Sequence, residues 1–143
     1  MASIKINSGD KVYDIEDENG VVRGQIRFDA SDINITQRID AFQNNMSIWM
    51  DELSQREGDV TDDDFAKILV EYDAKLKAEL NTLLDDENAS DVVFGNKSCL
   101  STYNGEFFIE RFVKAFLPII QKDAKKEAEK MAKRRDAYIS QVK

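Results

Sequence analysis

A regular repeat of large apolar residues in the first half of the chain constrains the fold more than any other sequence feature. Successive members lie four, three, four, three and four positions apart, which puts them on one side of an α-helix. The members are Ile35, Ile39, Phe42, Met46, Trp49 and Leu53. Asp32 or Asn34 can cap the first turn, and Glu57 and Gly58 follow the last. The sequence therefore predicts a helix over residues 33–56 with its apolar side in the core.

A second helix is predicted over residues 61–85. It opens at Thr61 with three aspartates in its first turn, where both side-chain capping and the helix dipole favour negative charge. Its apolar side is formed by Phe65, Ile68, Leu69, Tyr72, Leu76, Leu80, Leu83 and Leu84. Because only a short loop separates it from the first helix, the two should pack as an antiparallel pair.

Residues 11–28 precede these helices and carry the pattern of a β-hairpin. Asn19-Gly20 tolerates the positive φ angles of a tight turn, and β-branched residues flank it. Tyr13 and Ile15 alternate with acidic residues, as Ile26 and Phe28 alternate with Arg27. We expect two antiparallel strands with one apolar face.

The second half of the chain predicts turns, then a third helix and an extension of it. Residues 85–105 are polar around a short apolar island at residues 92–95, and a helix rich in aromatic residues follows at about 106–121. Pro118 lacks the amide hydrogen and should kink or end that helix. Beyond it, residues 122–143 are rich in strong helix formers and carry only a thin apolar seam, so this extension is expected to fray or to be completed by another chain.

These elements define a mainly α (α+β) protein, in which an N-terminal β-hairpin is followed by a bundle of three helices. One domain should span residues 1–121, since domains of this length usually have one core. The C-terminal helical extension, 122–143, is basic, with eight basic and four acidic residues, whereas residues 1–121 hold 12 basic and 24 acidic residues. The chain has no apolar run long enough to span a membrane, and residues 1–5 lack a secretory signal, so we expect a cytoplasmic protein with no membrane partner.

No part of the sequence predicts catalysis, a cofactor or a metal. Histidine is absent, which removes the usual general base and the commonest transition-metal ligand. A calcium loop starting at Asp86 fails because Asp91 stands where glycine is needed and Lys97 where the bidentate acid belongs. Cys99 has no histidine to activate it and is expected in a loop or the core. An acidic body also repels nucleic acid, so the basic extension is predicted to be a solvated helix face and not a nucleic-acid site.

Two stretches of the chain resemble the tail assembly chaperones of long-tailed bacteriophages and prophages. The first passes from hairpin to helix at residues 28–35, followed by Arg38 and Phe42. The second comprises residues 91–95, Gly105 and the aromatic helix that carries Phe108, Phe112 and Phe116 into residues 117–120. The resemblance covers most of residues 11–121 and implies a non-catalytic protein of the bacterial host cytoplasm that binds the tail tape measure protein before the tail tube polymerises. The extension from residue 122 onward departs from the family pattern.

Such a chaperone needs an apolar surface that accepts amphipathic helices. We expect that surface to include Phe94, Phe108, Phe112, Phe116, Met131, Tyr138 and Ile139. The alternative is that most of these phenylalanines are ordinary core residues. Two other functions also stay open: a structural or scaffold component of a phage particle, and a module that self-associates into a homo-oligomer through the extension.

Overall fold

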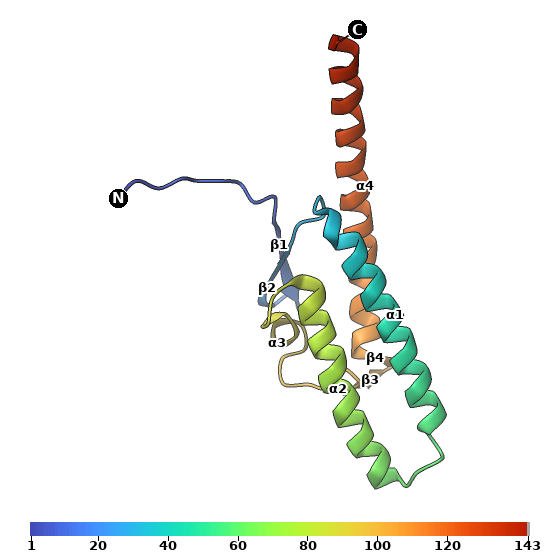
Figure 1. Ribbon diagram of the computed structural model, residues 1–143. Helices are drawn as coiled ribbons and strands as arrows, with labels where there is room; N and C mark the ends of the chain where they lie inside the picture. Colours follow the sequence, from blue (N-terminus) through green and yellow to red (C-terminus); the bar gives the residue numbers. More distant parts are fainter. Residues whose placement is uncertain (143) are drawn as a thin grey trace.

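The computed structural model describes residues 1–142, which form a mainly α protein with an N-terminal hairpin (Figure 1). The predicted fold class is confirmed. In chain order the elements are β1 (Lys11–Glu16), β2 (Val22–Phe28), α1 (Ile33–Arg56), α2 (Asp62–Leu84), α3 (Ala89–Phe94), β3 (Thr102–Tyr103), β4 (Glu106–Phe107) and α4 (Phe108–Val142). None of the helices within these described residues is long and apolar enough to cross a membrane.

The hairpin forms where the turn signal and the alternation predicted it. β1 and β2 pair antiparallel, with Tyr13 opposite Ile26, and the pairing is irregular beside Glu16. Gly20 has a φ of 77°, which a residue with a side chain rarely adopts. On the inner face Ile26 and Phe28 are buried, and Tyr13 packs partly buried beside them. The hairpin therefore presents an apolar face to the helices.

Helices α1 and α2 form the predicted antiparallel pair, with bounds at or within one residue of those expected. Asp32 caps α1 by accepting a hydrogen bond from the Asn34 amide at 2.9 Å, and Thr61 caps α2. Arg38 ties the pair together, because its Nε donates to the Leu83 carbonyl at 3.1 Å. The predicted stripe of α1 faces the core. Ile35, Ile39, Phe42 and Leu53 are buried, and Met46 and Trp49 pack partly buried against them.

The segment after α2 is more ordered than the predicted turns. It contains the six-residue helix α3 and a second antiparallel ribbon, β3–β4, which turns at Asn104 and Gly105. An element of two to six residues is too short to show a hydrophobic period, so these elements depend on contacts with the rest of the fold. Val93 and Phe94 of α3 supply such contacts, since both are buried in the core.

One expected outcome was that the third helix ends at Pro118, but α4 continues through this residue. It runs without a break over 35 residues and carries the chain well beyond the body (Figure 1). Pro118 is exposed, so its ring points away from the core, while its neighbours Leu117 and Ile120 are buried. Their packing offsets the one backbone hydrogen bond that proline cannot make. The predicted extension is thus the second half of α4, and its last residue, Lys143, lies outside the described residues.

Candidate partner-binding groove

A groove with a volume of about 790 Å³ separates the hairpin from the first half of α4. One wall comes from residues 13–18 of the hairpin with Arg23 and Ile26, and the other from residues of α4 between 108 and 119. Residues 101–103, at the start of the small ribbon, complete the lining together with Val93 and Lys97. Its volume lies within the range of about 300–1,000 Å³ that is usual for binding pockets in proteins.

Aromatic rings form the apolar wall of this groove along α4. Phe108, Phe112 and Phe116 follow each other at intervals of four residues, so they lie on one side of the helix. The rings of Phe112 and Phe116 stack at 5.0 Å, and Phe116 meets Phe28 of the hairpin edge to face at 5.4 Å. Phe108 and Phe112 are partly buried, whereas Phe116 is buried except for the part that faces the groove. Three of the predicted residues therefore share one site.

Phe94 lies behind this wall and not on its surface. Its side chain is 0% exposed, and its ring meets Phe108 edge to face at 5.0 Å and Phe112 at 6.2 Å. In this conformation it has no surface for a partner to touch. The expectation that Phe94 contributes contact surface is corrected accordingly: it is a core residue that holds the aromatic wall in place.

The three predicted residues of the extension are well separated from the groove. Met131, Tyr138 and Ile139 are 70%, 66% and 43% exposed. Met131 follows Phe116 by 15 residues on the same helix, which places it about 22 Å further along the axis. The seven predicted residues thus divide into one buried residue, an aromatic groove and a distant exposed seam.

The rim of the groove is strongly charged. Asp14, Glu16, Asp17 and Glu18 line it from the hairpin. Arg111 of α4 lies 5.1 Å from the centre of the Phe108 ring and 5.6 Å from that of Tyr103, and its guanidinium donates to the Glu106 carbonyl at 2.7 Å. These contacts fix Arg111 at the edge of the aromatic wall. A partner helix would meet apolar rings on the α4 wall of the groove, and four carboxylates with Arg23 on the hairpin side.

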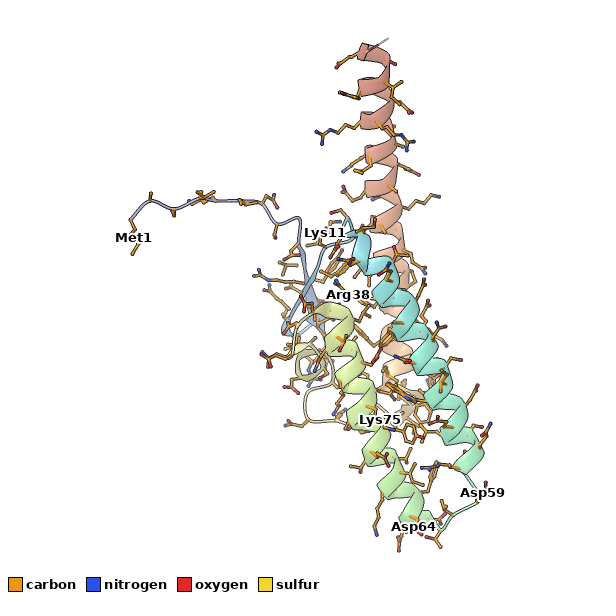
Figure 2. All side chains as sticks on the ribbon, viewed as in Figure 1. Met1, Lys11, Arg38, Asp59, Asp64 and Lys75 are labelled. Atoms are coloured by element: carbon orange, nitrogen blue, oxygen red, sulfur yellow. The ribbon has the colours of Figure 1, made fainter. Side chains whose placement is uncertain are left out.

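A hydrogen-bonded clamp on Asp123 holds the hairpin against α4. The Tyr13 hydroxyl donates to the Asp123 carboxylate, and the Lys11 Nζ lies 3.1 Å from the same oxygen. The hydrogen bond from Tyr13 lowers the pKa of Asp123, and the lysine adds to that effect. Burial and the adjacent carboxylate raise the pKa of Tyr13 above its ordinary value. Figure 2 shows Lys11 at the start of the hairpin, where the chain passes α4.

Sequence reasoning did not find the hairpin wall of the groove or its clamp. Tyr13 and Asp123 are 110 residues apart, and neither belongs to a motif. The one sequence signal for the hairpin wall was the alternation of Tyr13 and Ile15 with acidic residues. It predicted an apolar face on β1 but did not indicate which helix would cover that face. Ile119 was also not predicted as a site residue. It stands among core residues of the same helix in the sequence, yet it is 42% exposed and lines the groove.

Cys99 lies in the core, which is one of the two positions expected for it. It is 0% exposed, and its amide donates to the Asp73 carboxylate at 2.7 Å. Burial raises the pKa of the thiol. Within residues 1–142 no three side chains of the types His, Cys, Asp or Glu lie close enough together to hold a metal ion.

Comparison of the chain with protein-family models, with curated proteins and with solved structures gave no match.

Proposed function

We propose that this chain is a non-catalytic tail assembly chaperone that works in the cytoplasm of a bacterial host. It binds an amphipathic helix of the tail tape measure protein in the groove between the hairpin and α4. The observation that carries the proposal is the groove itself, with an aromatic wall, acidic residues on the hairpin rim and a volume of about 790 Å³. The resemblance at residues 28–42 and 91–120 names the partner.

The dimensions of the groove suit a short stretch of helix. The part of α4 from Phe108 to Ile119 is about 16 Å long, or three helical turns. Over that length an amphipathic helix presents apolar residues at positions i, i+3 or i+4, and i+7, which is the usual way for a helix to occupy an apolar groove. Ile15 of β1 is partly buried and adds apolar surface to the lining, whereas Ile26 and Val93 are almost fully buried there.

The charge of the chain fits the same role. Residues 1–121 hold 24 acidic against 12 basic residues. Such a body keeps a complex with an aggregation-prone partner in solution by mutual repulsion, and it repels the phosphates of nucleic acids. The acidic hairpin rim favours a partner helix with lysine or arginine beside its apolar stripe.

Co-expression with the tape measure protein of the same phage or prophage tests the proposal. The wild-type chain should keep that protein in the soluble fraction and co-purify with it. Ile119→Glu places a charge at the groove, and we expect the amount of co-purified partner to fall about tenfold. The matched control is Ile48→Glu: Ile48 is 53% exposed on α1, and among the described residues none from α1 lines the groove.

Retention of the partner by the Ile48→Glu variant and its loss from Ile119→Glu support the groove as the binding site. Equal retention by both variants overturns the groove, and failure of the wild-type chain to bind the tape measure protein overturns the named partner. A structural role in the particle makes a different prediction, since the chain would then be present in purified virions. Mass spectrometry of those virions distinguishes a lasting component from a chaperone that leaves.

A further inference from the structure

The distal part of α4, residues 131–142, stands clear of its own molecule and carries an unpaired apolar seam. Met131 and Tyr138 lie seven residues apart, so they fall on the same side of the helix, with Ile139 beside them. All three are exposed. Figure 2 shows the side chains of this part of α4 projecting into open space on every side. Because this part of α4 packs against no other element, only local helix propensity maintains it, and a partner surface would stabilise it.

We infer that this distal segment of one copy occupies the groove of a second copy. The inference concerns the groove assigned above to the partner helix, and it adds a second ligand for that groove: the chain itself. The segment is the kind of ligand that the groove suits, an amphipathic helix with a short apolar seam and basic residues beside it.

The lengths of the two surfaces agree. The aromatic wall from Phe108 to Phe116 covers eight residues of helix, or about 12 Å. The seam from Met131 to Ile139 also covers eight residues and the same distance. Apolar side chains at both ends of the seam can therefore lie against the wall at once.

The charges agree as well. Arg134 and Arg135 lie between Met131 and Tyr138 on the seam side, because they are three or four residues from one or both of these positions. On the groove, Glu16 and Glu18 are exposed at the hairpin rim. Arginine beside apolar residues is typical of protein interfaces, and opposite charges across the rim would fix the orientation of the bound helix.

The segment cannot enter the groove of its own molecule. The groove and the seam lie on one continuous helix, with Met131 about 22 Å beyond Phe116, and the clamp on Asp123 holds the hairpin between them. The occupied groove therefore belongs to another copy. Because the contact joins two unlike surfaces, association runs head to tail and continues beyond the dimer unless a ring closes. It also covers the groove until a better ligand displaces the segment.

A charge-swap experiment on the full chain tests this inference without the tape measure protein. Sedimentation velocity over a range of concentrations should show reversible self-association of the wild-type chain. Reversing either side, with Arg134→Glu and Arg135→Glu or with Glu16→Arg and Glu18→Arg, should weaken it about tenfold. In a mixture, the wild-type seam of the groove variant meets the wild-type groove of the seam variant, and the two reversed surfaces also carry opposite charges. Hetero-association of the two variants should therefore reappear on mixing. The control, Lys122→Glu with Lys133→Glu, makes the same charge change on the opposite side of α4 and should associate like the wild type.

Three results would overturn the inference: a wild-type chain that stays monomeric at high concentration, a control that dissociates as readily as the seam variant, or no recovery on mixing. These outcomes are independent of the partner proposed above. If the tape measure protein fails to bind while the charge swap succeeds, the proposed function falls and the self-association stands. If the partner binds and the chain is monomeric, only the self-association falls.

Discussion

Replacing Tyr13 by phenylalanine removes a single oxygen atom from the clamp that joins the hairpin to α4. The ring stays, so its stacking on Phe28 at 5.0 Å is retained. What is lost is the hydrogen bond from the hydroxyl to the carboxylate of Asp123. The change therefore tests the clamp separately from the packing around it.

The size of the effect follows from the surroundings of Asp123. A hydrogen bond to a charged group contributes about 1.5–3 kcal/mol to stability. The Asp123 side chain is only 12% exposed, but Lys11 remains paired with it at 3.1 Å, so the carboxylate keeps one partner. We expect a loss near the lower end of that range, about 1.5 kcal/mol, which corresponds to a fall in Tm of roughly 4 °C for a chain of this size.

The pH dependence of this loss has a definite sign. The hydrogen bond from Tyr13 lowers the pKa of Asp123 in the folded protein, while in the unfolded chain it is about 3.9. A lowered carboxyl pKa adds stability that is fully present above the unfolded pKa and is lost as the pH falls through the folded one. The gap between wild type and Tyr13→Phe should therefore be widest at neutral pH and shrink below about pH 4.

Urea unfolding followed by circular dichroism, at about pH 7 and again near pH 3, measures both quantities. Tyr103→Phe is the matched control, because Tyr103 is 65% exposed. A double-mutant cycle with Asp123→Asn isolates the coupling between the two groups. If Tyr13→Phe unfolds like the Tyr103 control at neutral pH, or if its loss of stability is the same in acid, the hydrogen bond to Asp123 does not hold the hairpin against α4.

Three further predictions concern stability and reactivity. Gly24→Ala should lower the free energy of unfolding in urea by about 1–3 kcal/mol. The added Cβ would lie 2.8 Å from a methyl group of Val92, a β-branched side chain with little freedom to move. Unchanged stability would contradict this close packing. Pro118→Ala should raise the free energy of unfolding by about 2 kcal/mol. The gain is less than the roughly 3 kcal/mol difference in helix propensity because proline also restricts the unfolded chain. A loss of stability in the variant would show that the proline ring makes stabilising contacts in the folded protein. Cys99 should react with a thiol reagent only after unfolding, since the side chain is buried and the pKa of its thiol is raised; fast labelling of the native protein would refute its place in the core.

The hairpin, α1 and α2 can be predicted from the sequence alone, because each is specified by signals a few residues apart. Asn19-Gly20 sets the turn, the spacing of Ile35 to Leu53 sets the buried side of α1, and Thr61 with its aspartates sets the start of α2. These signals act through backbone geometry and local capping, so no knowledge of distant residues is needed to interpret them. The uneven charge of the two ends was equally plain from composition.

Which apolar residues are core and which form a surface depends on tertiary packing. Phe94, Phe108, Phe112 and Phe116 are the same residue type, and their exposure depends on where β1 lies relative to α4. That position rests on contacts such as Tyr13 with Asp123, 110 residues apart, which no local pattern encodes. The passage of α4 through Pro118 has the same origin, since packing of its neighbours outweighs a local helix-breaking signal. Local preference specifies the elements, whereas the free energy of burying them together specifies the groove.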